Sequence, residues 1–188
     1  MKRKTTKDIL ADSFRELAEH KTIDKISVKE IVQNCEYSTA TFYRHFKDKY
    51  DLIVWDYTQS HRAIMDRLQE DGYRWRRTLL DSAAYFEEHK EYLTNLLLHT
   101  NGYDSFVRNM TEIHYDSFRR WLLQSAGVDT LDVKTRMYMR LYCHGAIGLT
   151  SEWILGKYEA SPEELAEIYE KSLPSPLRQY IDKYDTTS

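Results

Sequence analysis

Apolar residues recur at intervals of three and four along most of the 188-residue chain. This spacing places them on one face of a helix, and no long stretch alternates between apolar and polar positions as a half-buried strand would. The chain holds only 6 Gly and 3 Pro, which disfavours a turn-rich or disordered protein. The pattern therefore predicts an all-α fold, either as one sizeable core or as a small head on a larger body.

The first 50 residues predict three short helices. A helix over residues 6–19 carries one apolar stripe. Ser27 and Glu30 have the spacing of a capping box, in which the hydroxyl caps a backbone N–H and the carboxylate reaches back. A second helix is therefore expected to begin at Ser27 and to end near residue 34. After a short turn, Ser38 is the expected cap of the third helix.

The third helix is expected to extend to about Phe46. Phe42 and Phe46 are four residues apart and share a face, whereas Ala40 and Arg44 point the other way. An isolated helix this short is marginal in water, so the packing of the two phenylalanines must hold it. Two short helices joined by a tight turn, the second with a polar exposed face, have the layout of a helix-turn-helix that enters a DNA major groove.

The rest of the chain predicts a longer helical body over residues 51–188, behind a helix-turn-helix domain over residues 1–50. A long fourth helix, from about Asp48 to Asp71, would link this head to the body. The fold expected is thus all-α, with a helical-bundle body that dimerises and regulates the head. Further helices are expected over residues 74–89, 91–100, 103–125, 132–157, 161–172 and 176–184.

The stretch from Tyr37 to Leu52 resembles the signature of the TetR family of transcriptional regulators. Ser, Thr, Tyr, His, Phe and Lys fall there at the family's spacing, in the string YSTATFYRHFKDKYDL. The close resemblance covers roughly the first 55 residues, and the remainder matches in length and all-helical architecture. It implies a homodimer that reads a palindromic operator in double-stranded DNA, because two copies of a small reader gain much affinity over one.

The resemblance also implies roles for single residues. Thr39 and Ala40, at the tip of the third helix, match base-facing positions, and Lys29 matches a position that reaches a base edge or a phosphate. Ser38 lies at the helix start, where hydroxyls and backbone N–H groups bind phosphate oxygens. Arg44 is added on its own chemistry, because a long exposed guanidinium can fork onto a guanine. The matched groove and phosphate contacts are Thr41, Tyr43, His45 and Lys49.

Some of these side chains have an alternative place within the head. Tyr43 can pack on the first helix, Arg44 can pair with Glu36 or Asp48, and His45 can be an ordinary surface histidine. Glu36 stands where the family usually has glycine, since that turn favours a left-handed backbone. A glutamate there would cost roughly 1 kcal/mol if its φ is positive.

Charge is distributed unevenly along the chain. Residues 1–50 hold 11 Lys and Arg against 8 Asp and Glu, whereas residues 51–188 hold 16 against 22. A basic head suits a polyanion, although random variation of surface charge is the alternative. The N-terminal sequence MKRK could likewise be an arm on the DNA backbone or a solvated end of the chain.

The helices over 132–157 and 161–172 resemble the pair that forms a four-helix dimer interface in this family. Gly145 and Gly148 lie within the first of them, where a glycine costs close to 1 kcal/mol relative to alanine. Two glycines at such positions indicate the close approach of another helix. We expect Leu149 and Trp153 to share this dimer interface, and packing within one chain is the alternative for the glycines.

An aromatic cavity between the body helices could hold a small-molecule effector. The alternative for each candidate is a place in a filled core. The candidates are His61, Met65, Tyr85, Tyr92, Phe106, Tyr115, Phe118 and His144.

Two modes of regulation follow. A dimeric, ligand-responsive repressor is the main interpretation. The body also loosely resembles the activators of dihydroxyacetone-kinase operons, a TetR subgroup controlled by a protein coactivator. A tightly filled core would favour such an activator, and a large cavity would favour the repressor.

Other classes of protein are disfavoured by missing motifs. The sequence has no Gly-rich phosphate loop, no HExxH and no GxSxG, so an enzyme is not expected. Cys35 and Cys143 have no CxxC partner, so we expect no disulfide, no metal site and no cofactor. No stretch approaches a membrane span, and the N-terminus lacks the apolar run of a secretion signal. We therefore expect a cytoplasmic protein with no membrane partner.

Overall fold

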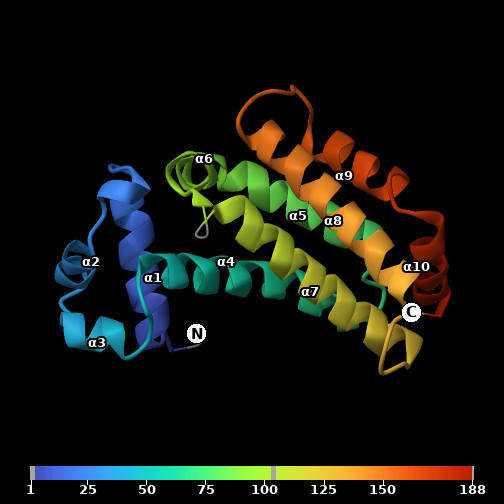
Figure 1. Cartoon of the computed structure of the whole chain (residues 1–188), viewed down its shortest axis with the longest axis horizontal. Coiled ribbons are helices and arrows are strands. Elements are labelled where there is room, and N and C mark those ends of the chain that lie inside the picture. Colours follow the sequence, from blue (N-terminus) through green and yellow to red (C-terminus); the bar gives the residue numbers. More distant parts are fainter. Residues whose placement is uncertain (1–2, 103–104, 188) are drawn as a thin grey trace. The chain divides into compact units, whose positions relative to one another are not determined.

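The computed structural model describes residues 3–102 and 105–187 (Figure 1). These described residues form helices joined by turns and loops, with no strand among them. The all-α prediction is confirmed. The chain divides into two compact units. The head unit comprises the described residues up to Gln59 together with Lys90–Phe106, and the body unit comprises Ser60–His89 and the residues from Val107 onward. A segment from mid-chain therefore belongs to the head unit, and the expected domain boundary at residue 50 stays a prediction.

The head unit is built on a small apolar core. Its helix α6 packs against α1 and against the short 3-10 turn η1. Leu10, Phe14, Ile31, Phe42 and Leu52 are fully buried there. The elements are α1 (Thr6–Ala18), η1 (Ile23–Lys25), α2 (Val28–Asn34), α3 (Thr39–Tyr43), α4 (Lys49–Met65, whose last turns belong to the body) and α6 (Lys90–His99).

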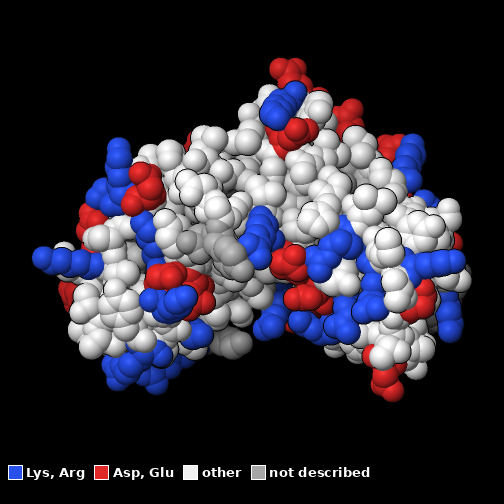
Figure 2. Space-filling view, viewed as in Figure 1, with Lys and Arg blue, Asp and Glu red and all other residues white. Residues whose placement is uncertain are grey.

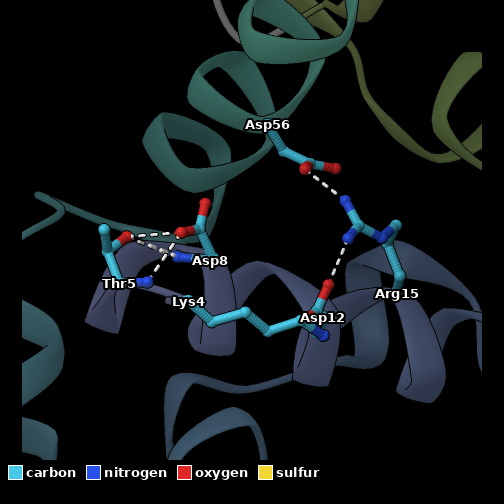
Figure 3. Close-up of polar contacts among 6 residues, drawn as sticks. All are labelled: Lys4, Thr5, Asp8, Asp12, Arg15 and Asp56. Carbon is cyan, nitrogen blue, oxygen red and sulfur yellow. Dashed lines mark hydrogen bonds and ion pairs between the residues drawn. The ribbon is translucent and has the colours of Figure 1, made fainter. Parts of the chain in front are cut away.

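Polar side chains fix both the start of α1 and its position on α4 (Figure 3). The Thr5 hydroxyl accepts from the Asp8 backbone N–H at 3.3 Å, and the Asp8 carboxylate accepts from the Thr5 N–H at 2.7 Å. Two turns further on, the Arg15 guanidinium donates both to Asp12 on its own helix and to the buried Asp56 of α4. An ion pair to a buried carboxylate is specific in geometry, so this contact sets α1 against α4.

The body unit is a bundle of longer helices. Within it, α5 packs against α9, and α8 packs against α10. None of the described helices combines the length and the apolar character needed to cross a membrane. The elements are η2 (Asp66–Gln69), α5 (Trp75–Glu88), α7 (Phe106–Ala126), α8 (Val133–Ile154), α9 (Pro162–Lys171) and α10 (Ser175–Thr187).

Two helices end earlier than the sequence predicts. Helix α3 stops at Tyr43, and the chain then tightens into a turn in which the His45 N–H donates to the Phe42 carbonyl at 2.9 Å. Helix α4 stops at Met65 and continues as the tighter η2, before Gly72 reverses the chain with a φ of +75°. The expected start of the seventh helix at Tyr103, and the first two residues of the basic N-terminal segment, lie outside the described residues.

Candidate functional site

The turn between α2 and α3 has the left-handed backbone that a glycine would favour. Ser27 caps α2 in the expected capping box with Glu30. Glu36 adopts a φ of +58°, and it is the one non-glycine residue with a positive φ in the described part of the chain. The next residue, Tyr37, donates its N–H to the Val32 carbonyl at 2.8 Å. The turn therefore keeps the left-handed geometry despite a glutamate, at a cost in strain.

Helix α3 presents a polar surface on an apolar base. The Ser38 hydroxyl accepts from the Thr41 N–H at 3.1 Å and caps the helix. Phe42 and Phe46 are buried, and their rings pack 5.7 Å apart. Thr39 and Ala40, at the tip of the helix, are exposed. The fold thus holds the tip outward, as the sequence pattern predicts.

The larger polar side chains beside this tip are also accessible. Tyr43 is 60% exposed and contacts Phe42 edge-on, which leaves most of its side chain accessible. The Arg44 guanidinium donates to the Thr41 hydroxyl at 3.1 Å, and this is a different partner from the expected Glu36 or Asp48. The exposed Lys29 lies at the start of α2, and His45 is half-buried. Figure 2 shows Lys and Arg side chains around the loop that follows α3.

Lys49, the first residue of α4, makes contacts within the head. Its ammonium donates to the backbone carbonyls of Ile23, Asp24 and Ile26 at 2.8, 2.9 and 2.8 Å. Partial burial lowers its pKa from the usual value. A protonated lysine has three donors, and all three are used here. The phosphate contact that the family resemblance implies for Lys49 stays a prediction.

Helix α8 exposes an apolar face. A Cβ built on Gly145 or Gly148 meets no described atom within 4 Å, so none of the described helices packs closely on them. Met137 is 66% exposed and Leu141 is 70% exposed, and Val133 precedes them by one turn. Figure 2 shows a largely uncharged surface over the C-terminal part of this helix, with charged side chains beside its N-terminal part. An apolar face of this kind is typical of an interaction surface.

A groove of about 360 Å³ runs between α8 and α9 beside this face. Leu149, one of the predicted interface residues, lines it together with Ile168. Trp153, also predicted for the interface, lies instead in the interior, where its indole N–H donates to the Ala160 carbonyl at 2.9 Å. Trp153 thus holds the loop between α8 and α9 against its own helix. The apolar character of a tryptophan does not by itself distinguish this role from a place in an interface.

A cavity of about 70 Å³ lies within the body unit. Its walls come from the last turns of α4 and from α5, α7, α8 and α9. Three of the eight predicted effector residues line it, namely His61, Met65 and Phe118. Most of the wall comes from residues that the sequence did not single out, including Trp75, Thr78, Ser82, Phe86, His114, Tyr142, Cys143, Thr150 and Tyr169.

The missed residues carried a weak signal. Trp75, Thr78 and Ser82 follow helical spacing on one face of α5, and Tyr142 and Thr150 do so on α8. Such a stripe identifies a buried face. It cannot say whether that face borders a filled core or a hollow, because this depends on the volumes of side chains from other helices.

Two predicted effector residues belong to the head unit. The Tyr92 ring packs edge-on against Phe14, with centroids 6.4 Å apart. The Phe106 ring packs edge-on against Tyr57 at 5.1 Å. Both therefore contribute to the head core and not to the body cavity.

Three others lie in the body unit away from the cavity wall. The Tyr85 ring packs beside His89, with centroids 4.5 Å apart. The Arg140 guanidinium lies 3.8 Å above the Tyr115 ring, a cation–π contact. His144 is exposed on α8.

The cavity is electrically neutral. None of the described residues that line it is Asp, Glu, Lys or Arg. The His61 and His114 rings pack with centroids 4.0 Å apart. Burial lowers the pKa of His61 to about 4, desolvation lowers the pKa of His114 well below its usual value, and burial raises the pKa of Cys143 to about 12. These groups are uncharged near neutral pH, so a charged guest would lack a counterion.

Both parts of the chain match known protein families. Residues 10–54 match a family described as bacterial regulatory proteins, tetR family, and residues 73–175 match a family described as transcriptional regulator C-terminal region. The HTH-type dhaKLM operon transcriptional activator DhaS of Lactococcus lactis subsp. lactis (strain IL1403) is 24% identical over 101 residues. That match spans 54% of this chain and 54% of the relative, so about half of the relative's length is covered.

Solved structures share the fold over nearly the whole chain. The dihydroxyacetone kinase operon activator DhaS is 21% identical, with a TM-score of 0.63 over 94% of this chain and 96% of that one. A TetR regulator from Rhodococcus sp. RHA1 is 17% identical, with a TM-score of 0.63 over 91% and 96%. Thermus thermophilus FadR, a repressor solved with lauroyl-CoA, is 15% identical, with a TM-score of 0.61 over 89% and 92%. With both family matches in place, the chain belongs to the TetR family of bacterial transcriptional regulators.

Proposed function

We propose that the protein binds a palindromic operator as a homodimer, with α3 of each copy in a major groove. The observation that carries this proposal is the exposed tip of α3, Thr39 and Ala40, held outward by the buried Phe42 and Phe46. Small side chains at a helix tip let the helix backbone approach base edges closely, while the surrounding polar groups take phosphates. The proposed partners of DNA are Lys29, Ser38, Thr41, Tyr43, Arg44 and His45. A cytoplasmic location is part of the same proposal.

The exposed face of α8 supports the dimer. Met137 and Leu141 are the side chains that a second copy would cover, and Gly145 and Gly148 leave room for its backbone. A two-fold axis at this face makes the same patch contact itself, which is how isologous dimers form. Two reading helices then sit about one helical turn apart on the operator and read symmetric half-sites.

In the main interpretation the protein is a repressor released by a small molecule. The body cavity supports this, because its wall includes His61 and Met65 at the end of α4, the helix that begins at Lys49 in the head. An effector that tilts α4 would change the spacing of the two reading helices, as a two-state shift. FadR of Thermus thermophilus, named as a repressor in complex with lauroyl-CoA, shares this fold.

A second candidate is an activator controlled by a protein coactivator. The cavity volume favours it, because 70 Å³ is far below the roughly 300–1,000 Å³ of a typical ligand pocket. The similarity to DhaS, named as an operon activator, points the same way. The two candidates share the head and the dimer, and they differ in what the body binds and in the sign of regulation.

Operator binding is tested by selecting bound sequences from random duplex DNA with the purified protein. We expect a palindromic consensus. Tyr43→Ala should weaken binding to it and flatten the salt dependence of the affinity, because a phosphate contact is lost. A selection that returns no consensus, or a Tyr43→Ala protein with unchanged affinity and salt slope, would contradict the proposed reading surface.

The two candidates are separated by a reporter placed behind the selected operator. Removing a repressor raises reporter transcription, and removing an activator lowers it. Pairing this measurement with isothermal titration against cell metabolites and against a co-expressed protein partner shows which kind of molecule the body binds.

A further inference from the structure

The connection between α1 and α2 is held by side chains from two other helices of the head unit. Asn95, in the middle of α6, donates its amide N–H groups to the carbonyls of Ala18 at 3.0 Å and Lys21 at 2.9 Å. Its amide oxygen accepts from the Ile23 N–H at 3.1 Å. The amide thus uses both of its donors and its acceptor on one short piece of backbone.

Lys49 holds the other side of the same connection. Its three donors are all committed to the carbonyls of Ile23, Asp24 and Ile26. We call the side chains of Asn95 and Lys49, with the backbone from Ala18 to Ile26, the connection clamp. At a second point, His99 near the end of α6 lies 3.5 Å from the Asp24 carboxylate.

The clamp lies directly before the reading elements. Ile26 is followed by Ser27, the cap of α2, and α2 leads through the left-handed Glu36 turn into α3. Helix α2 has seven residues and α3 has five, so neither is long enough to orient itself. The direction in which α3 points therefore depends on where the connection is held.

Carbonyls at the end of a helix can be satisfied by water. Here the end of α1 is satisfied instead by a side chain that is 77 residues away in the sequence. Bonds from one amide to three backbone groups fit a single placement of α6 on the connection, and water would impose no such geometry.

We propose that Asn95 and Lys49 are positioning residues for DNA reading, and that Lys49 acts through the clamp and not through a phosphate. The inference rests on the proposed operator-binding function. It makes α6 part of the reading apparatus, although the helix lies outside the helix-turn-helix in the sequence.

The test measures operator affinity, affinity for unrelated duplex DNA and the salt slope in the full-length protein. Asn95→Leu keeps the side-chain size and removes all three hydrogen bonds, and Lys49→Met does the same for the ammonium. We expect each to weaken operator binding about tenfold, since each substitution removes three hydrogen bonds from the connection. Binding to unrelated DNA and the salt slope should stay as in the wild type. The matched control is Leu98→Ala, an exposed position on α6 outside the clamp, which should change nothing.

Each part of the proposal has its own contradicting result. A salt slope that falls by about one in Lys49→Met means a lost phosphate contact and overturns the role given to Lys49. Operator affinity within twofold of the wild type in Asn95→Leu overturns the role given to Asn95. If the wild type itself does not prefer its selected operator over unrelated DNA, the proposed function fails instead.

A second variant, Asn95→Asp, helps to distinguish a lower affinity caused by unfolding from one caused by lost positioning. Asn95→Asp keeps the acceptor for the Ile23 N–H and places a carboxylate against two carbonyls, so its operator affinity should also fall. All affinities are measured at a temperature where circular dichroism shows each variant fully folded. Hydrogen exchange at the Ile23 amide should quicken in Asn95→Leu and stay slow in Asn95→Asp. Equal exchange in the wild type and in Asn95→Leu would count against the clamp.

Discussion

The head and the body differ in how completely their own residues fill or cover them. In the head, side chains such as Asn95 and Lys49 satisfy the backbone of the connecting segment, and the exposed surface of α3 is largely polar. In the body, α8 leaves Met137 and Leu141 in solvent, and a neutral cavity remains inside. Under the proposed function, the head must hold its shape within one chain, because base contacts depend on geometry. The proposed dimerisation and response of the body instead need apolar surface and volume that another molecule can fill.

The largest expected effect comes from charging the open face of the body. Leu141→Glu should break the homodimer and weaken operator binding by at least about 100-fold, roughly 2.7 kcal/mol, because a carboxylate would be buried in an apolar interface and half of the reader lost. Light scattering gives the mass in solution, and fluorescence anisotropy gives the affinity. Gln124→Glu, which adds the same charge at an exposed position of α7, should leave both unchanged. A Leu141→Glu protein that stays dimeric would remove this face from the interface.

The next effect concerns acid stability of the body. Burial lowers the pKa of His61 to about 4, so the folded state keeps it neutral while the unfolded state protonates near the usual value of 6.5. The contribution of neutral His61 to the free energy of unfolding is complete above the pKa of the unfolded state, and it is lost as the pH falls from there toward 4. His61→Phe should reduce the loss of unfolding free energy between neutral pH and about pH 4.5 by roughly 2.4 kcal/mol in urea unfolding.

The exposed His20 is the matched control for this experiment. His20→Phe should leave the acid dependence as in the wild type. If the free energy of unfolding falls with acid equally in the wild type and in His61→Phe, the cavity histidine does not control the acid stability.

A smaller effect is expected from the reading surface of the head. Arg44→Ala should cost about 1–3 kcal/mol on the operator and relax specificity at one base pair, if the guanidinium leaves Thr41 and forks onto a guanine. Affinities for operators changed one base pair at a time give the specificity profile. Lys157→Ala removes one positive charge from an exposed body site and should not change this profile. A uniform loss across all operators would assign Arg44 to phosphate.

The smallest effect is expected at the turn of the reader. Glu36→Gly should stabilise the protein by about 0.5–1 kcal/mol, because φ at +58° strains any side chain. Gln33→Gly, on the exposed side of α2, should instead destabilise it by about 1 kcal/mol. Chemical unfolding of both variants measures the difference. Destabilisation by both would mean that the Glu36 side chain contributes more than its strain costs.

Local chemistry made much of the helical pattern predictable. The hydroxyl of Ser27 caps α2, with Glu30 three residues later, as the sequence predicts. Ser161 and Glu164 have the same spacing and begin α9 in the same way. The signature around α3 predicted the family, which the comparisons confirm. Helix ends were less accurate, because the early stops of α3 and α4 depend on tight turns with no distinct residue type.

The candidate sites were predictable only in part. The exposure of Thr39 and Ala40 follows from the spacing of Phe42 and Phe46, a property of one short helix. The cavity wall does not follow from any single helix, and aromatic composition brought in Tyr92 and Phe106, which fill the head core. Trp153 shows the same limit, since an apolar residue on α8 suits an interface or an interior equally well.

The sequence by itself determined the helical class, the starts of capped helices and the family, because caps, periodicity and the signature are properties of residues close together in the chain. Only the tertiary structure decided that α6 joins the head, that Asn95 and Lys49 hold the connection before α2, and that the two glycines of α8 face open space. These facts depend on contacts between residues far apart in the sequence. A polar residue such as Asn95 carries no local mark of its distant partner, since many backbone groups could have accepted its bonds.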